Sequence, residues 1–496
     1  MPPARPFANI LAMFVDCHPR IHCAAALLVL GGCVSTPAPH AAPSPMAAPA
    51  ARPSPIAAPA TVGYLVMDLE SGQVLAARNA DRPFVPASTV KLLTAVAALE
   101  VLGADHRFQT RLMTTGEGTG GRLAGDLLLV GGGDPLLGLG DLMGLATRLA
   151  DKGIREIGGR FLYDQSWAPP VAAIDPGQPA DAPYNAGVGA LALDFNRQRL
   201  TWDAAGATYM TPPAPEAARP GRLDEASAPG VRAHWRDGRW MLAATEAAGS
   251  IELPVKQPGL ATARIFRALA GRLGIRVPVP EPGTAPAGAT TLARLTSAPL
   301  ADVVRQGLEY SNNVVAEMIG LATARALGLT APTPASAAAR LQRLFETRLA
   351  GSDWSGLRLR NLSGLSWKSH ITPRQMVALL RHADGRRFGG WPLRALLPTA
   401  GQRGSFRGRF RDPGTALRMW AKTGTMHYAK GLAGYLLTAN GRRLAFAVYG
   451  MDETRRQAYD ADPAREGPAG QARARDWIVD AEAHEEALVR SWLSTY

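Results

Sequence analysis

A nearly continuous hydrophobic segment spans residues 90–99, and Lys91 is the charged residue within it. The segment follows Pro86-Ala87-Ser88-Thr89, where a proline precedes two hydroxyl side chains. Such residues are typical of a helix N-terminus, because a hydroxyl oxygen can accept a hydrogen bond from an unpaired backbone N–H. The pattern therefore predicts a buried helix that begins near Ser88.

Elsewhere the pattern alternates with the period of a strand or repeats with the period of a helix. Three hairpins are predicted, at 63–68 with 73–77, at 110–115 with 125–130, and at 432–438 with 443–451. In the last of these, Asn440-Gly441 favours a type I′ turn. Helices are predicted at 142–152, 262–273, 299–309 and 314–327, from about 373 onward, and at 475–493, with a strand at 159–164. Short strands separated by proline and glycine predict a small β-rich region at 196–253.

Two further patterns resemble binding motifs by their letters alone. Gly116-x-Gly118-x-x-Gly121 matches the dinucleotide fingerprint, but it precedes a predicted strand rather than a helix, so we interpret it as a turn. The cluster His484-Glu485-Glu486 lacks the spacing of metal ligands and is interpreted as a solvated helix face. We therefore expect no metal site and no cofactor.

The first 32 residues have the pattern of an export signal. Arg20 precedes an apolar run at 23–32 that is too short to span a bilayer as a helix. The run ends at Leu30-Gly31-Gly32-Cys33, which resembles a bacterial lipobox, so we expect a signal peptide over 1–32 and lipid attachment at Cys33. An ordinary secretory signal cleaved nearby is the alternative, and Met13 is a second candidate start of translation.

Residues 33–61 are rich in proline and alanine and cannot bury apolar area, so they are expected to form an extended tether. At about 3.1 Å per residue, roughly 25 residues would reach about 80 Å from a membrane. All three cysteines lie at or before Cys33, so the folded part contains no disulfide. We expect a periplasmic protein that is lipid-anchored to the outer membrane.

The formal net charge of +13 raises the possibility of a nucleic-acid partner. The arginines are scattered along the chain, however, with neither a long basic run nor an aromatic-rich RNA-binding pattern. We expect no nucleic-acid partner, although the charge would favour proximity to an anionic cell-wall polymer or lipid.

Ser88 and Lys91 are three residues apart, which places them on one face of the predicted helix. The helix N-terminus favours a developing alkoxide, and apolar surroundings lower the pKa of a lysine so that it can act as a base. The alternative is an N-cap serine followed by a lysine whose ammonium reaches solvent. The spacing by itself does not decide between a nucleophile and a helix cap.

Two later motifs favour the catalytic interpretation. Ser311-Asn312-Asn313 provides an S-x-N, and Lys422-Thr423-Gly424, followed by Thr425, provides a K-T-G. The order S-x-x-K, S-x-N and K-T-G is the signature of penicillin-binding proteins and serine β-lactamases.

Further stretches make the resemblance more specific. They are Gly125-Asp126-Leu127 through Gly133-Asp134-Pro135-Leu136, Tyr184-Asn185-Ala186, Ser363-Gly364-Leu365-Ser366 and Leu397-Pro398-Thr399-Ala400-Gly401. The chain resembles the class C low-molecular-mass penicillin-binding proteins, the D-alanyl-D-alanine carboxypeptidase/endopeptidases of peptidase family S13. The resemblance runs from about residue 62 to the C-terminus.

The resemblance implies an α/β (α+β) fold, with a transpeptidase or β-lactamase-like domain whose antiparallel sheet is flanked by helices, and two smaller domains inserted after the first helix. We expect the catalytic domain at 62–108 and 290–496, a second domain at 109–195 and 254–289, and a small β-rich third domain at 196–253.

The three motifs together can carry out acyl transfer. Ser88 would attack the carbonyl of the penultimate D-alanine, and Lys91 would accept its proton. Ser311 would relay a proton to the leaving amine under the electrostatic influence of Lys422. Asn313 would hold both the substrate amide and Lys91.

The strand that carries the K-T-G would complete the site. The backbone N–H groups of Ser88 and Thr425 would form the oxyanion hole. The hydroxyls of Thr423 and Thr425, with the lysine of the motif, suit a substrate carboxylate. Gly424 would let the strand approach the ligand without an intervening side chain.

At the positions that recognise the peptide side chain in the family, this chain matches the family pattern less closely. Asp164 matches an acidic residue of the family, and the resemblance implies that it binds the amino group of the diaminopimelate side chain. The alternative is an aspartate that caps or stabilises a turn. In relatives an arginine can follow the Gly-Leu-Ser loop, where this chain has Trp367 and then Lys368. His427 stands where an amide is found in a studied type of relative.

The sequence therefore predicts a serine D-Ala-D-Ala carboxypeptidase and endopeptidase that acts on peptidoglycan peptides and is acylated by β-lactams. A β-lactamase or esterase on the same fold is one alternative, although no deacylating glutamate loop can be assigned and the insertion is larger than such an enzyme needs. A non-catalytic cell-wall-binding lipoprotein is the other, although all three motifs are intact.

Overall fold

The computed structural model describes residues 60–203, 208–212, 221–223, 233–236, 239–243, 248–349, 351–402 and 404–496. The predicted signal peptide, Cys33 and nearly all of the predicted tether lie outside these residues. Within the described part of the chain, no helix is both long and apolar enough to cross a bilayer.

Nine α-helices occur among the described residues. They are α1 (Val90–Val101), α2 (Leu139–Asp151), α3 (Pro258–Arg272), α4 (Leu300–Glu309), α5 (Asn313–Ala326), α6 (Pro334–Arg348), α7 (Pro373–Asp384), α8 (Glu453–Ala461) and α9 (Pro468–Thr495). A 3-10 turn, η1 (Ala87–Thr89), leads directly into α1.

The largest core surrounds an antiparallel sheet of five strands in the order β17-β18-β19-β1-β2. Their bounds are β1 (Thr61–Asp68), β2 (Val74–Arg78), β17 (Met419–Met426), β18 (Ala429–Leu437) and β19 (Arg443–Met451). The first of these strands pairs with the last, so that Thr61 lies opposite Met451. The sheet thus joins two distant parts of the sequence.

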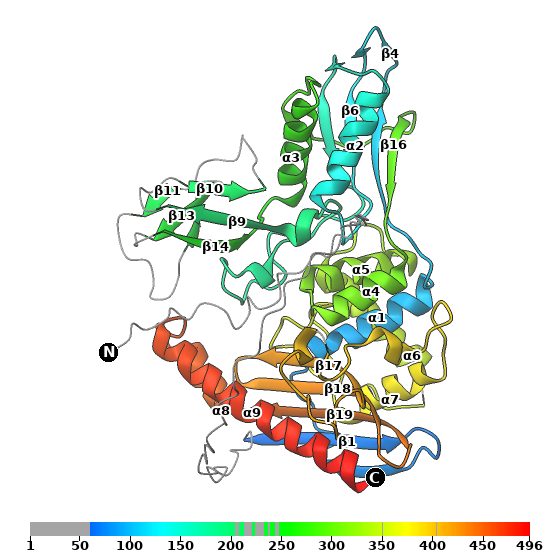
Figure 1. The fold of residues 1–496 in the computed structure, drawn as a ribbon, viewed down its shortest axis with the longest axis vertical. Coiled ribbons are helices and arrows are strands. Elements are labelled where there is room, and N and C mark those ends of the chain that lie inside the picture. The colour runs from blue at the N-terminus through cyan, green and yellow to red at the C-terminus, as the bar shows by residue number, and fades with distance from the viewer. Residues whose placement is uncertain are drawn as a thin grey trace, which may run out of the picture. The chain divides into compact units, whose positions relative to one another are not determined.

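Helices cover both faces of this sheet (Figure 1). Alternate strand residues enter different cores because successive side chains of a strand point to opposite faces. Ala433 and Ala445 pack in the cluster that includes α1 and α7 residues. Leu432 and Leu444 pack instead in the cluster that includes Val489 of α9. This arrangement matches the flanked antiparallel sheet predicted from the sequence.

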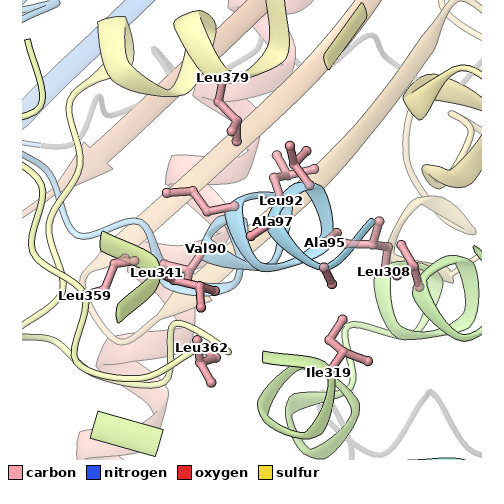
Figure 2. Close-up of a cluster of buried hydrophobic side chains, with 14 of the residues drawn as sticks. Val90, Leu92, Ala95, Ala97, Leu308, Ile319, Leu341, Leu359, Leu362 and Leu379 are labelled. Atoms are coloured by element: carbon pink, nitrogen blue, oxygen red, sulfur yellow. The ribbon is translucent and has the colours of Figure 1, made fainter. Parts of the chain in front are cut away.

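Helix α1 lies within the first of these cores and is buried on nearly all sides. Figure 2 shows its side chains and those that surround it, including Val90, Leu92, Ala95, Ala97, Leu308, Ile319, Leu341, Leu359, Leu362 and Leu379. Burying an apolar side chain of this size contributes roughly 1.5–3 kcal/mol. The predicted buried helix is confirmed, and its enclosure fixes the position of Ser88 at its start.

A second sheet of five strands lies in the inserted part of the chain, in the order β15-β8-β6-β3-β16. Its strands are β3 (Gln109–Thr114), β6 (Leu127–Val130), β8 (Phe161–Asp164), β15 (Pro280–Pro282) and β16 (Thr290–Thr296). The assignment of residues 290–296 to the catalytic domain is corrected here. Strand β16 pairs with β3, and Ala293 packs in the core that α2 and α3 share with this sheet.

Three smaller sheets complete the inserted part. They have the orders β4-β5-β7, β10-β9-β14 and β11-β13-β12. Their strands are β4 (Gly118–Thr119), β5 (Arg122–Leu123), β7 (Glu156–Ile157), β9 (Arg197–Trp202), β10 (Thr208–Thr211), β11 (Gly221–Leu223), β12 (Ala233–Arg236), β13 (Arg239–Ala243) and β14 (Gly249–Pro254). The β-rich character predicted for 196–253 is confirmed, and the glycine-rich stretch at 116–121 contains β4 and a turn rather than a helix N-terminus.

The turn at Asn440-Gly441 differs from the predicted type I′. Of the two residues, Gly441 has a positive φ of 79°, whereas Asn440 does not, and type I′ requires both. The loop is longer than two residues, since the Thr438 N–H donates to the Arg442 carbonyl. Helix α6 was not predicted, although Thr333 and Ser336 form a capping box at its start.

Candidate active site

Ser88 and Lys91 lie side by side at the start of α1. Ser88 belongs to η1 and is half-buried, whereas Lys91 is only 2% exposed. The Lys91 ammonium lies 2.7 Å from the Ser88 hydroxyl oxygen. The three-residue spacing therefore brings the two functional groups into direct contact, as the sequence predicted.

Lys91 also donates to two groups from distant parts of the chain. The acceptors are the Asn313 side-chain oxygen at 2.7 Å and the Ser363 carbonyl oxygen at 2.8 Å. Burial lowers the pKa of Lys91 to about 7, and the opposing charge of Glu317 limits the fall. At neutral pH the protonated and unprotonated forms of this side chain are therefore present in comparable amounts.

Glu317 is a buried carboxylate that the sequence analysis did not single out. Its Oε1 accepts hydrogen bonds from the backbone N–H groups of Leu362 and Ser363, at 3.0 and 2.8 Å. Burial raises the pKa of Glu317 to about 7, against the effect of these hydrogen bonds. Its position four residues after Asn313 on α5 places both on one helix face, which was a signal available in the sequence.

Strand β17 approaches the turn that carries Ser88. A Cβ added to Gly424 would lie 2.4 Å from the Pro86 carbonyl oxygen and 3.3 Å from the Ser88 nitrogen. Gly424 is therefore required by the close approach of the chain's own backbone, which adds to the role expected for it toward a ligand.

The lysine of the K-T-G motif is fully buried. Burial lowers the pKa of Lys422 well below its ordinary value, and the charges of Lys91 and Lys430 add to this effect. Its Nζ donates to the Thr423 carbonyl oxygen at 2.7 Å. Lys422 is thus close enough to Lys91 for the two charges to interact.

The S-x-N motif follows α4 and ends at Asn313, the first residue of α5. Ser311 has a positive φ of 53°, which is unusual for a residue with a side chain. Within the described residues its hydroxyl forms no hydrogen bond, so no direct bond joins it to Lys422. Asn313 donates from its amide to the Tyr184 carbonyl oxygen at 2.9 Å, which connects the motif with the inserted part of the chain.

A third buried lysine, Lys430 of β18, was also missed. It is 2% exposed, donates to the Thr425 hydroxyl oxygen at 2.6 Å and pairs with Glu482 of α9. The prediction of a solvated face at His484-Glu485-Glu486 was wrong in its central residue. Glu485 is buried and pairs with Arg409, because α9 packs this face against the sheet.

Asp164 lies at the end of β8 with both carboxylate oxygens occupied. They accept hydrogen bonds from the Ser166 and Ala285 backbone N–H groups, each at 2.7 Å, and the residue is 3% exposed. This geometry favours the turn aspartate, the alternative considered for this residue, over a ligand for a substrate amine.

The two departures from the family pattern lie near one another. Arg456 of α8 stacks 4.8 Å from the centre of the Trp367 ring and also contacts the ring of Tyr459. The His427 ring meets the same Tyr459 ring edge-on, with centroids 4.8 Å apart. Trp367 and His427 therefore contact a common arginine–tyrosine pair on α8.

Comparison with known proteins identifies the family. Residues 54–465 match the D-Ala-D-Ala carboxypeptidase 3 (S13) family. The chain belongs to this family. The three motifs quoted from the sequence thus stand in an S13 chain, and the resemblance inferred from them is confirmed.

Individual relatives agree with this assignment. The chain is 32% identical over 432 residues to a D-alanyl-D-alanine carboxypeptidase of Actinomadura sp. (strain R39), covering 78% of this chain and 77% of that one. It is 30% identical over 390 residues to a carboxypeptidase of Mycobacterium tuberculosis, covering 77% and 74%.

The crystal structure of penicillin-binding protein 4 (dacB) from Haemophilus influenzae has the same fold. Its TM-score is 0.69 at 24% identity, and the match covers 78% of this chain and 90% of that one. The same Haemophilus protein complexed with a β-lactam matches with a TM-score of 0.66. The predicted penicillin-binding-protein fold is therefore confirmed.

Proposed function

We propose that this S13 protein is a serine D-Ala-D-Ala carboxypeptidase that works through an acyl-enzyme on Ser88. The observation that carries the proposal is the 2.7 Å contact between Lys91 and Ser88, made by an amine whose pKa burial lowers to about 7. A nucleophile and a base at hydrogen-bond distance are the minimum that such a reaction needs.

In the acylation step, the Ser88 oxygen attacks the carbonyl carbon of the penultimate D-alanine as its proton passes to Lys91. The C–N bond to the terminal D-alanine then breaks, and the leaving nitrogen takes a proton relayed through Ser311. Water attacks the resulting ester and regenerates the Ser88 hydroxyl. The buried Lys422 lies near this region, and its protonated form would favour the anionic groups that form or bind there.

Two backbone N–H groups are suited to stabilise the oxyanion. The Ala421 N–H points away from β18, because it donates to the Pro398 carbonyl oxygen on the other side of β17. By the two-residue alternation of a strand, the Thr425 N–H points to the same open edge. A Cβ added to Gly424 would lie 3.3 Å from the Ser88 nitrogen, so the strand passes close to the second donor, the Ser88 N–H.

We assign the terminal carboxylate of the substrate to the hydroxyls of Thr423 and Thr425 together with Lys422. Thr425 is the exposed residue of β17, so its side chain is accessible to a ligand. β-Lactams carry a carboxylate in an equivalent place and are expected to acylate Ser88.

Cleavage of D-alanyl cross-links is a second candidate activity. It is supported by the contacts that the inserted part makes with the site: Tyr184 with Asn313, and Gln178 with the Leu365 carbonyl oxygen at 3.4 Å. A wall built from inserted residues can grip a substrate longer than a terminal dipeptide and align its scissile bond. Mass spectrometry of cross-linked muropeptides after digestion tests this activity, and intact cross-links alongside released D-alanine would exclude it.

We place this activity in the periplasm, with the protein anchored to the outer membrane through a lipid on Cys33. The pattern at 30–33 and the proline-rich stretch after it support this placement. Peptidoglycan peptides are accordingly the proposed substrates.

A time course of fluorescent penicillin labelling tests the main proposal, with D-alanine release from a D-Ala-D-Ala peptide measured in parallel. We expect stable labelling that Ser88→Ala abolishes while the circular dichroism spectrum stays unchanged. Rapid turnover of the label would indicate a β-lactamase instead. Absence of both labelling and D-alanine release would indicate a non-catalytic scaffold.

A further inference from the structure

Lys430 makes a contact that has no role in the reaction proposed above. It lies on β18 directly opposite Thr425 of β17 in the antiparallel register. Its ammonium lies 2.6 Å from the Thr425 hydroxyl oxygen and also pairs with the Glu482 carboxylate of α9. The side chain is 2% exposed, so it lies behind Thr425 rather than in open solvent.

This contact determines how the Thr425 hydroxyl can bind a ligand. An ammonium has only hydrogen-bond donors, so the hydroxyl oxygen must accept from Lys430. The hydroxyl proton is then left free to point away from the ammonium. The nearby positive charge also polarises the O–H bond and strengthens it as a donor. Thr425 is thus prepared to donate to an anionic acceptor.

The surroundings of Lys430 hold it in this place. Arg409, 12% exposed at its side chain, contacts Glu482, Glu485 and Glu486 of α9. Burial by itself would raise the pKa of Glu482, but the charges of Lys430 and Arg409 outweigh burial and hold it below its ordinary value. A carboxylate partner on a helix that packs against the sheet therefore restrains the Lys430 ammonium beside Thr425.

The residue type at position 430 supports this interpretation. The chain uses arginine for most of its cations, yet a lysine occupies this buried position. A compact ammonium can donate to Thr425 and Glu482 at once, whereas a planar guanidinium would need more room.

We propose that Lys430 is a positioning residue for substrate recognition: it directs the Thr425 hydroxyl to donate a hydrogen bond to the carboxylate of the terminal D-alanine. The proposal rests on the carboxypeptidase function assigned above. It makes α9, through Glu482, an indirect part of the recognition of the peptide C-terminus.

The test compares two peptides that end in D-Ala-D-Ala, one with a free C-terminal carboxylate and one with a C-terminal amide. Lys430→Met should lower kcat/KM on the free carboxylate by about tenfold to a hundredfold, the range of a charge-assisted hydrogen bond. On the amide the loss should stay within about threefold, because the interaction with the anion is already absent there. An equal loss on both peptides would overturn the proposal.

A double-mutant cycle separates positioning from a merely structural role. In a Thr425→Val background, Lys430→Met should cause no further loss on the free carboxylate, because the hydroxyl that it directs is gone. Additive losses would show that Lys430 acts independently of Thr425 and would also overturn the proposal.

Two further variants guard against misfolding and non-specific charge effects. Lys430→Met with Glu482→Gln also removes the carboxylate that would otherwise lose its lysine partner, and it should keep the same substrate-dependent loss. Arg490→Met removes a cation of α9 that pairs with Glu486 of the same helix and with Asp412, and that makes no hydrogen bond to Thr425 within the described part of the chain. The Arg490→Met variant should hydrolyse both peptides at the wild-type rates. If it also lost activity selectively on the free carboxylate, the loss in Lys430→Met would reflect net charge and not the contact with Thr425.

The proposal can fail separately from the proposed function. A wild type that releases no D-alanine and takes no penicillin label would refute the function itself. A labelled and active wild type whose Lys430→Met variant loses activity equally on both peptides, or on neither, would refute only the role of Lys430.

Discussion

A Cβ placed on Gly364 would lie only 1.9 Å from the carbonyl oxygen of Ala87. The loop that supplies the Ser363 carbonyl to Lys91 is therefore packed directly against the turn that carries Ser88. Gly364 has a φ of 79° and Ala87 a φ of 45°, so both sides of this contact have left-handed backbone conformations. The turn that carries Ser88 and the loop that accepts a hydrogen bond from Lys91 are thus in direct backbone contact.

Gly364→Ala is expected to destabilise the protein by about 2–5 kcal/mol, because the methyl group meets a backbone atom and the residue has a positive φ. Penicillin acylation should fall with it, since the turn before Ser88 has to move. Thermal unfolding and labelling kinetics measure the two effects. Gly385→Ala is the matched control, because a Cβ there meets nothing within 4 Å, and it should change stability by about 1 kcal/mol or less.

Lys91→Arg keeps a positive charge but removes the base, because a guanidinium does not lose its proton near neutral pH. The rate of acylation should fall by about two to four orders of magnitude, the usual contribution of a general base. Stopped-flow or timed gel labelling with fluorescent penicillin measures this rate. A variant that acylates at nearly the wild-type rate would reduce Lys91 to a structural residue.

The acylation rate should rise as the pH increases through about 7 and level off above it, because the active form of Lys91 is the neutral amine. Glu317 raises the pKa of Lys91 against the effect of burial. Glu317→Gln removes this charge, so the pKa of Lys91 should fall and the rising limb of the profile should move to lower pH. Acylation rates between pH 5 and 9 test the direction, and a shift to higher pH would contradict the assignment of Lys91 as the base.

Asp164→Ala leaves the Ser166 and Ala285 N–H groups without their acceptor, at a cost of about 1–3 kcal/mol for each unsatisfied group. The structure thus predicts lower thermal stability and a similar loss of activity on peptides with and without a diaminopimelate side chain. Asp164→Asn keeps one acceptor oxygen and should lose less. Selective loss on the side-chain-bearing peptide, at unchanged stability, would restore the ligand-binding interpretation.

Cys33→Ser should prevent lipid attachment and move the protein from the membrane fraction to the soluble fraction. Fractionation followed by immunoblotting measures the distribution. Unchanged membrane association would contradict the lipobox interpretation or the assumed start of translation.

The sequence predicted the site best where function depends on short spacing. Ser88 and Lys91 share one helix turn, so their contact follows from local geometry alone. Glu317 and Lys430 were missed because their roles arise from long-range packing, of α5 against the 362–363 loop and of α9 against β18. The same cause explains the wrong interpretation of Glu485, whose polar sequence context gives no indication of the helix face that becomes buried. The boundary at β16 was missed because a strand's partner is not encoded in its own pattern.

The pairing of β1 with β19 has a consequence for how the protein is made. A growing polypeptide presents Ser88 and Lys91 early, but the strands that complete their surroundings, β17 to β19, follow only from residue 419 onward. Until then the edge of β1 that pairs with β19 has no partner strand, and such long-range pairing forms slowly and exposes aggregation-prone edges. We therefore expect the surroundings proposed for Ser88 to be complete only after residues 419–451 have been synthesised, and a chain that ends before them should take no penicillin label.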